Sequence, residues 1–166
     1  MYQCFSGTLH AEQVSLEEIA DHYGTPTFVY SEDMITRAYQ SFSAAFGNHP
    51  TDVCYAVKAN SNIAILQCLA ELGAGFDIVS GGELSRIIKA GGSPQRTVFS
   101  GVGKQDWEIE FALKEDIGCF NVESASELNR IAKIAERLDL VAPISIRVNP
   151  DVDPKTHPYI STGLKE

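Results

Sequence analysis

After Pro50 the chain alternates between short apolar runs and longer amphipathic stretches, and this alternation limits its fold more than any other feature. The apolar runs are DVCYAV, GFDIVS, TVFSG, GCFNV and PISIRVNP. Amphipathic stretches separate them, and the first places Ile65, Leu66, Leu69 and Leu72 on one helical face. Short buried strands joined by helices require parallel crossover connections. The pattern therefore predicts an α/β fold, either an open doubly wound sheet or a (β/α) barrel.

Polar residues at the strand ends help to choose between these two folds. They are Lys58, Asp77, Ser100, Asn121 and Arg147. Five successive polar endings favour a barrel, because strands of an open sheet contribute to a site only at the switch point. Any α/β protein has some polar strand ends, since loops are polar, and this weakens the preference. We expect a partial (β/α)8 barrel of about five parallel strands with intervening helices, truncated before closure.

The first 30 residues differ from this repeating pattern. Ser15 and Glu18 form a capping-box pattern that predicts a short helix, and TFVY (27–30) then predicts a brief strand. A second helix is expected from Ser31 to Phe46, before the Gly47 and Pro50 loop. We therefore divide the chain into an N-terminal segment, 1–30, and an incomplete barrel domain, 31–166.

Composition excludes several classes of partner. The chain has 13 Lys and Arg against 22 Asp and Glu, a net charge of −9, which opposes binding to nucleic acid or to anionic membranes. The N-terminus has no basic, apolar signal pattern and no run is long enough to span a bilayer, so we expect a cytoplasmic protein. Without C-x-x-C or metal-ligand spacing, the cysteines at 4, 54, 68 and 119 are expected to be reduced core residues, with no metal site.

Lys58 has two possible roles. It follows the first apolar run directly, and the simpler interpretation is a lysine that extends from a loop into solvent. In the functional interpretation, partial desolvation at a barrel mouth lowers the pKa of the amine, which then attacks an aldehyde. The strand pattern by itself leaves both possibilities open.

Longer motifs connect this lysine to a known family. The stretches CYAVKANSN, GFDIVSGGEL, VFSGVGK, FNVES and ISIRVNPDVDPKTHPYISTGLKE together resemble the amino-terminal barrel portion of the diaminopimelate decarboxylases. The likeness covers essentially the whole chain in order and spacing. Ornithine and arginine decarboxylases and, more remotely, alanine racemase share this barrel, and THPYISTGLKE looks most like the diaminopimelate branch.

The resemblance implies roles for four residues. Lys58 matches the lysine that family members link covalently to pyridoxal 5′-phosphate, and Asp77 matches an acidic residue beside that cofactor. Arg147 matches a cation at the same rim, expected to pair with Asp77. Glu83 matches an acid near the cofactor, although Ser80 and Glu83 also form a capping box and both roles are compatible.

The implied activity is removal of carbon dioxide from meso-diaminopimelate to give L-lysine, in a cytoplasmic homodimer acting on a small amino acid. The family's second β-domain, associated with residues 1–30, and part of its site would lie beyond Glu166. We therefore expect the 166-residue chain to be a fragment that is inactive alone. The alternatives are a related ornithine- or arginine-type decarboxylase, or a non-catalytic pyridoxal phosphate-binding or regulatory protein.

Overall fold

A computed structural model describes residues 1–149, and its centre is a parallel sheet of five strands. The strands follow the order β4-β5-β6-β7-β8, so each strand pairs with its neighbour in the sequence. Their bounds are β4 Cys54–Ala56, β5 Gly75–Ile78, β6 Thr97–Phe99, β7 Cys119–Val122 and β8 Ile144–Ile146. All five predicted strands are thus present, and they are parallel as expected.

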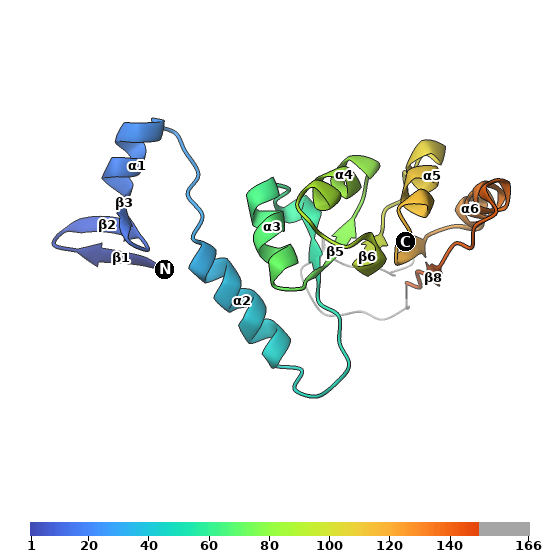
Figure 1. Cartoon of the computed structure of the whole chain (residues 1–166), viewed down its shortest axis with the longest axis horizontal. Coiled ribbons are helices and arrows are strands. Elements are labelled where there is room, and N and C mark those ends of the chain that lie inside the picture. Colours follow the sequence, from blue (N-terminus) through green and yellow to red (C-terminus); the bar gives the residue numbers. More distant parts are fainter. Residues whose placement is uncertain (150–166) are drawn as a thin grey trace, which may run out of the picture.

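Four α-helices connect these strands, and Figure 1 shows them along one side of the sheet, with each helix packed against the next. They are α3 Ile63–Glu71, α4 Gly81–Lys89, α5 Asp106–Lys114 and α6 Ala125–Leu138. Sequential strand order with helices on one face is the arrangement of a (β/α) barrel, whereas a doubly wound sheet has helices on both faces. The barrel prediction is confirmed, and the sheet of the described residues is not closed.

The side chains of the sheet divide by size between its two faces. Phe76, Ile78, Phe99 and Phe120 are fully buried in the core shared with the helices. Parallel register places Asp77 beside Ala56 and Val98, so these three residues point to the opposite, concave face. The burial of large apolar side chains under the helices therefore leaves small and polar side chains on the concave face.

Local capping explains where the helices begin. The side chains of Asn62, Ser80 and Ser124 accept hydrogen bonds from backbone amides in the first turns of α3, α4 and α6. Two 3-10 turns, η1 Val57–Ala59 and η2 Pro94–Arg96, complete the loops. Because a capped helix begins within three residues of the end of β5 and of β7, the polar residues between these strands and their helices are held close to the sheet.

The N-terminal part is more elaborate than predicted. Three antiparallel strands precede the first helix: β1 Tyr2–Phe5, β2 Thr8–Ala11 and β3 Val14–Ser15. Helices α1 Leu16–Tyr23 and α2 Glu32–Ala44 follow, and α1 has the predicted Ser15–Glu18 capping box. The sequence did not reveal this sheet because β1 is exposed at all four positions and lacks apolar alternation.

The strand predicted for TFVY is wrong. Residues 27–30 form no strand, and Phe28 is 88% exposed. A brief extended segment becomes a strand only where another strand offers backbone partners, and no described strand pairs with this one. In the described structure, residues 27–30 connect α1 to α2 instead (Figure 1).

The cysteines differ from the expectation of core residues. No disulfide links them, but Cys4 and Cys54 are exposed and Cys68 and Cys119 are only partly buried. Cys54 belongs to β4, which pairs with a single neighbouring strand among the described residues, and Cys119 lies on the concave face with Val98. Both positions lack a covering layer in the described residues.

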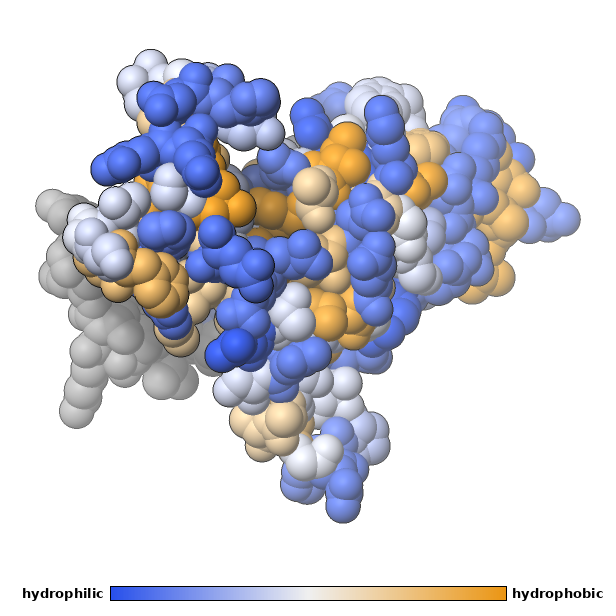
Figure 2. Space-filling model, turned by 60° about the vertical axis from the view of Figure 1, so that its left-hand side comes forward, coloured by the Kyte–Doolittle hydropathy of each residue, from blue (hydrophilic) through white to orange (hydrophobic). Residues whose placement is uncertain are grey.

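The surface between the N-terminal part and the sheet is apolar. Figure 2 shows orange side chains gathered around a hollow there. A groove between α2 and β4 is lined by Ile35, Tyr39, Phe42, Tyr55 and Leu69, among others. Among residues 1–149, no helix combines the length and the apolar character needed to cross a bilayer.

Candidate functional site

Lys58 lies in the 3-10 turn that follows β4. Val57, which precedes it, is fully buried in the helix-side core and anchors the turn, while Lys58 itself is exposed. The hydroxyl of Tyr55 donates a hydrogen bond of 3.3 Å to the carbonyl oxygen of Asn60 and so bridges the turn. Within residues 1–149, the Lys58 ammonium has no hydrogen bond or ion pair, and these residues do not supply the desolvation that the functional interpretation expected.

Asp77 is the strand-end residue placed nearest to this turn by sheet register. It pairs with Ala56, two residues before Lys58, and it is partly buried. Ser100 Oγ donates a hydrogen bond of 2.5 Å to Asp77 Oδ1, and Asn121 Nδ2 donates one of 2.9 Å to Ser100 Oγ. Three of the predicted rim residues therefore form one hydrogen-bonded chain across β5, β6 and β7.

Arg147 joins the same rim, but not through the predicted partner. Its Nη1 lies 3.1 Å from Glu123 Oε2, and the Arg147–Asp77 pair expected from the sequence is not formed. Arg147 follows β8 and Asp77 belongs to β5, three strand spacings away, which is about 14 Å along the sheet. Glu123 follows the neighbouring strand β7, so it lies within reach of Arg147.

Glu123 lies among the predicted rim residues, although the sequence did not single it out. Its carboxylate is only 12% exposed, and it also accepts a hydrogen bond of 3.0 Å from the backbone amide of Gly101. With Ser100, Asn121, Ser145 and Arg147 it lines an open depression at the carboxyl ends of the strands. Its position directly after the strand that ends in Asn121 and Val122 was the available signal.

Glu83 lies at the predicted helix cap, but its carboxylate binds the amide of Val79 and not that of Ser80, so the reciprocal bond of a capping box is not formed. The Ser80 side chain accepts a hydrogen bond of 3.2 Å from the Glu83 amide, and Glu83 Oε2 accepts one of 2.7 Å from the amide of Val79. At least one carboxylate oxygen is therefore committed to the start of α4. Its contact with a cofactor stays a prediction.

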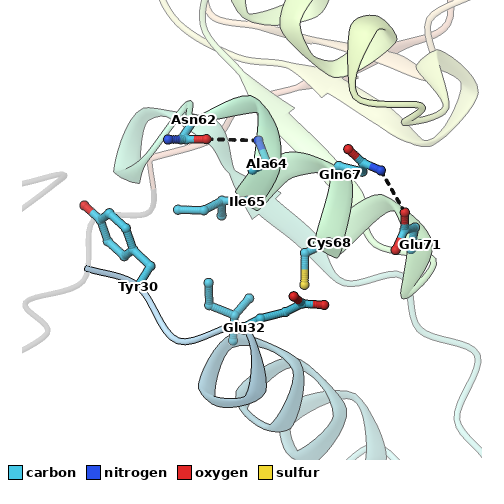
Figure 3. Close-up of a pocket in the computed structure, with 9 residues that line it drawn as sticks. Tyr30, Glu32, Asn62, Ala64, Ile65, Gln67, Cys68 and Glu71 are labelled. Atoms are coloured by element: carbon cyan, nitrogen blue, oxygen red, sulfur yellow. Dashed lines mark hydrogen bonds between the residues drawn. The ribbon is translucent and has the colours of Figure 1, made fainter. Parts of the chain in front are cut away.

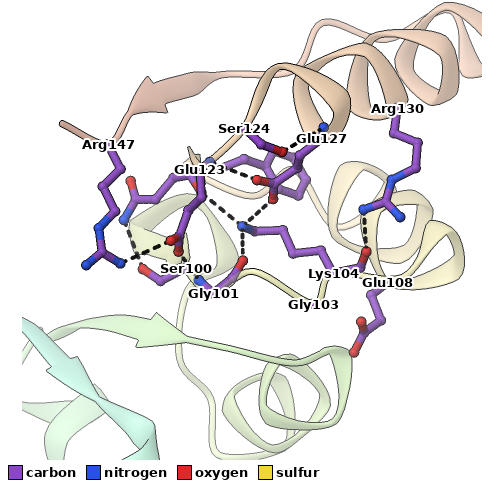
Figure 4. Close-up of polar contacts among 12 residues, drawn as sticks. Ser100, Gly101, Gly103, Lys104, Glu108, Glu123, Ser124, Glu127, Arg130 and Arg147 are labelled. Carbon is purple, nitrogen blue, oxygen red and sulfur yellow. Dashed lines mark hydrogen bonds and ion pairs between the residues drawn. The ribbon is translucent and has the colours of Figure 1, made fainter. Parts of the chain in front are cut away.

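The capping pattern at Ser124 and Glu127 has an additional role that the sequence did not predict. Glu127 Oε1 lies 2.6 Å from the ammonium of Lys104, and the two side chains are 6% and 0% exposed. Figure 4 shows this buried ion pair directly behind Glu123 and Gly101. A Lys in a loop and a Glu in a helix cap look ordinary in the sequence, so only the tertiary structure reveals the pair.

Burial changes the acidity of three neighbouring groups. It raises the pKa of the Tyr55 hydroxyl. Partial removal of water by surrounding protein atoms is also the main reason why the pKa values of the Cys54 and Cys119 thiols are raised, although Cys54 is exposed and Cys119 only partly buried. Near neutral pH these thiols therefore remain protonated and are poor nucleophiles.

A pyridine aldehyde cofactor fits the chemistry of this rim. An amine that reacts with an aldehyde is present at Lys58, and the carboxylate of Asp77 is oriented by Ser100 on the adjacent strand. A negative charge beside an imine favours its protonated form. The concave face beside them carries the small side chain of Ala56, whereas Gly75, at the start of β5, is closely packed, since an added Cβ there would lie 2.6 Å from the Arg96 carbonyl oxygen and 2.8 Å from Cys54 Sγ. Lys58 and Asp77 are therefore the two groups through which the rim fits this cofactor.

A second cleft lies away from this rim. Figure 3 shows it between the start of α2 and α3, lined by Tyr30, Glu32, Cys68 and Glu71, among others. Its visible contacts are the helix cap from Asn62 and a side-chain pair within α3. The cleft contains none of the strand-end residues, so we do not assign the predicted chemistry to it.

The motif THPYISTGLKE lies outside the described residues.

Comparison with known proteins gives consistent results. The family described as "Pyridoxal-dependent decarboxylase, pyridoxal binding domain" matches residues 32–166. A diaminopimelate decarboxylase from Neisseria meningitidis serogroup B is 56% identical over 158 residues, covering 95% of this chain and 38% of that protein. The chain thus spans well under half the length of this curated relative.

Solved structures agree with the sequence match. Diaminopimelate decarboxylase from Helicobacter pylori, in complex with L-lysine, superposes with a TM-score of 0.85 at 53% identity, covering 90% of this chain and 38% of that one. The enzyme from M. jannaschii superposes with a TM-score of 0.87 at 37% identity, covering 95% of this chain and 38% of that one. The chain therefore belongs to the pyridoxal-dependent decarboxylases, and its residues 32–166 match their pyridoxal-binding domain.

Proposed function

We propose that this chain is the cofactor-binding part of a diaminopimelate decarboxylase, which removes carbon dioxide from meso-diaminopimelate and releases L-lysine. The observation that carries the proposal is the position of the Lys58 turn next to Asp77, whose carboxylate Ser100 orients at the carboxyl ends of the strands. Relatives more than half identical to this chain carry that enzyme's name. This combination supports both the cofactor and the substrate class.

Each rim residue has a distinct part in this proposal. Bound pyridoxal phosphate supplies an electron sink for the bond pair left by departing carbon dioxide. The Lys58 amine would bind the cofactor covalently and yield its place to the substrate amine. Asp77 would maintain a negative charge beside that bond, and Arg147, held by Glu123, would provide a cation at the same rim. Glu83 would approach the cofactor from the start of α4.

The compartment, the oligomeric state and the domain division that we propose also follow the family resemblance. We propose a cytoplasmic homodimer, with residues 1–30 associated with a β-domain and residues 31–166 belonging to the barrel. The match of the pyridoxal-binding family from residue 32 onward is compatible with this division. A small amino acid is the proposed substrate, and the net charge of −9 argues against nucleic acid as a partner.

Replacing Lys58 tests the central assignment. In the complete polypeptide that contains these residues, Lys58→Ala should abolish the visible absorption of covalently bound cofactor and the release of carbon dioxide from meso-diaminopimelate. The reason is that alanine has no amine to bind the aldehyde. Lys89→Ala, which removes an exposed lysine at the end of α4, is the matched control and should retain both signals.

The same assay separates the alternatives. Retained covalent cofactor and turnover in Lys58→Ala would refute the assignment. Faster carbon dioxide release from L-ornithine or L-arginine than from meso-diaminopimelate would indicate a related decarboxylase. Cofactor absorption without carbon dioxide release from any of these substrates would indicate a non-catalytic binding protein.

A further inference from the structure

The buried ion pair between Lys104 and Glu127 is the strongest feature that the proposed function leaves unused. The Lys104 side chain is fully buried, and its ammonium donates three hydrogen bonds: 2.6 Å to Glu127 Oε1, 2.8 Å to the carbonyl oxygen of Gly101 and 2.9 Å to that of Asn121. All three protons of the ammonium thus have acceptors. Because each proton has an acceptor, the charged ammonium can remain in the core.

The pair connects three segments that carry rim residues. Gly101 follows Ser100 at the end of β6, Asn121 belongs to β7, and Glu127 lies in the first turn of α6. The second oxygen of Glu127 accepts a hydrogen bond of 2.8 Å from the amide of Glu123. One ammonium and one carboxylate therefore bind the backbone immediately beside Ser100, Asn121 and Glu123.

A further contact closes the loop between β6 and α5. Arg130 Nη2, one turn further along α6 from Glu127, donates a hydrogen bond of 2.7 Å to the carbonyl oxygen of Lys104. In Figure 4 the Lys104 side chain extends from this loop toward Glu127, with Gly101 and Glu123 on the rim side of the pair. The loop is thus attached to α6 through both the side chain and the backbone of Lys104.

We propose that Lys104 and Glu127 are positioning residues that fix the loop after β6 against the end of β7, so that Ser100 and Glu123 orient Asp77 and Arg147. This inference rests on the proposed function, because it assigns the pair to that site. A buried ion pair is often no more stabilising than apolar residues of similar volume. Its directional hydrogen bonds, however, specify the relative placement of the segments that they join.

The test removes both charges together while keeping the side-chain lengths. Lys104→Met combined with Glu127→Gln, made in the complete polypeptide, should still fold with a moderately lowered melting temperature, because neither charge is left buried alone but the carbonyl oxygens of Gly101 and Asn121 lose a donor. Hydrogen exchange of the Gly101 and Glu123 amides, measured without cofactor, should accelerate at least tenfold. With cofactor, kcat should fall more than KM changes, by up to about 100-fold, because the rim groups are misplaced.

The matched control lies on the same helix. Ile131→Val shortens a buried side chain of α6 and should lower the melting temperature while leaving exchange at Gly101 and Glu123 unchanged. Equal exchange and kcat losses in this control would overturn the positioning role, and so would wild-type exchange rates in the double variant. If the double variant does not fold, the same comparison is made with Lys104→Gln combined with Glu127→Gln, in which neither charge is left buried alone.

Failure of the proposed function is distinguishable from failure of this inference. A wild-type protein that neither binds pyridoxal phosphate nor releases carbon dioxide from meso-diaminopimelate would reject the function. The exchange measurement needs neither cofactor nor substrate. It therefore still decides whether Lys104 and Glu127 hold the Gly101 and Glu123 backbone in place.

Discussion

At the scale of single residues, the rim shows which polar groups depend on one another. Ser100 is the centre of the chain that includes Asp77 and Asn121, because its hydroxyl donates to the first and accepts from the second. Its position after β6 was predicted from the sequence, whereas its two partners were not. Hydrogen-bond direction depends on side-chain orientation, which a strand pattern does not specify.

Replacing Ser100 should therefore destabilise the rim. Ser100→Ala removes one donor to the Asp77 carboxylate and one acceptor for Asn121, and a hydrogen bond to a charged group typically contributes about 1.5–3 kcal/mol. Because Ser100 is only partly buried, water can replace part of the hydrogen bonding that alanine removes. We expect the free energy of unfolding, measured by urea denaturation, to fall by about 1–2 kcal/mol.

Ser145→Ala is the matched control for this variant. Ser145 lines the same depression, is exposed, and its side chain makes no hydrogen bond within residues 1–149. Its replacement should change the free energy of unfolding by less than about 0.5 kcal/mol. Equal effects of the two substitutions would contradict the stabilising role of the Ser100 contacts.

At the scale of elements, the N-terminal sheet is attached to α2 through Glu12. Glu12 Oε1 accepts hydrogen bonds of 2.7 Å from Ser31 Oγ and 3.0 Å from the amide of Asp33. The α-amino group of Met1 donates to Ser31 Oγ at 3.0 Å. The hydrogen bond from Ser31, followed by that from Asp33, lowers the pKa of the Glu12 carboxyl.

This attachment should weaken in acid. Because the pKa of Glu12 is lowered in the folded protein, its contribution is complete above the ordinary value of 4.5 and is lost as the pH falls through the folded-state pKa. The NMR shift of the Asp33 amide should follow this titration. In Glu12→Gln the amide should already have its acid-state shift at pH 6, because the charged acceptor is absent.

Glu17→Gln provides the comparison for this titration. Glu17 is an exposed acidic residue in the first turn of α1 and is not one of the hydrogen-bond partners of Ser31 or Asp33. Its replacement should leave the Asp33 titration unchanged. An Asp33 shift that does not depend on Glu12 would show that other groups attach the N-terminal sheet.

At the scale of the whole molecule, the sheet of the described residues has two edges. β4 and β8 each pair with one neighbour, and the apolar residues Ile144, Ile146 and Val148 on or beside β8 are 41%, 67% and 75% exposed. Exposed apolar strand edges promote pairing between chains. The face that Ile146 shares with Val122 is the helix-side face, which helices cover along the rest of the sheet.

The 166-residue chain by itself should consequently self-associate. Light scattering should detect oligomers at chain concentrations on the order of micromolar to millimolar, because exposed sheet edges associate in this range. Ile146→Lys should reduce this association, since a charged edge residue opposes strand pairing. Gln40→Lys adds the same charge on an exposed position of α2 and should not reduce it. A monomeric wild-type chain would contradict the prediction.

Much of the fold could be predicted because its signals are local. Apolar periodicity marked all five parallel strands and the helices between them, and Ser15 and Ser80 marked two helix starts. The N-terminal sheet was missed because its first strand is exposed on both faces. The segment TFVY was assigned wrongly because strand formation requires a partner that is distant in the sequence.

The sequence by itself determined the alternation of the five parallel strands with their helices, and the placement of Lys58, Asp77, Ser100, Asn121 and Arg147 at the carboxyl ends of these strands. Only the tertiary structure decided that Arg147 pairs with Glu123 and that Lys104 is buried against Glu127. Periodicity and capping act over a few residues, so they can be read along the chain. Partner choice depends on the spacing between strands and on burial, which arise only when distant segments pack together.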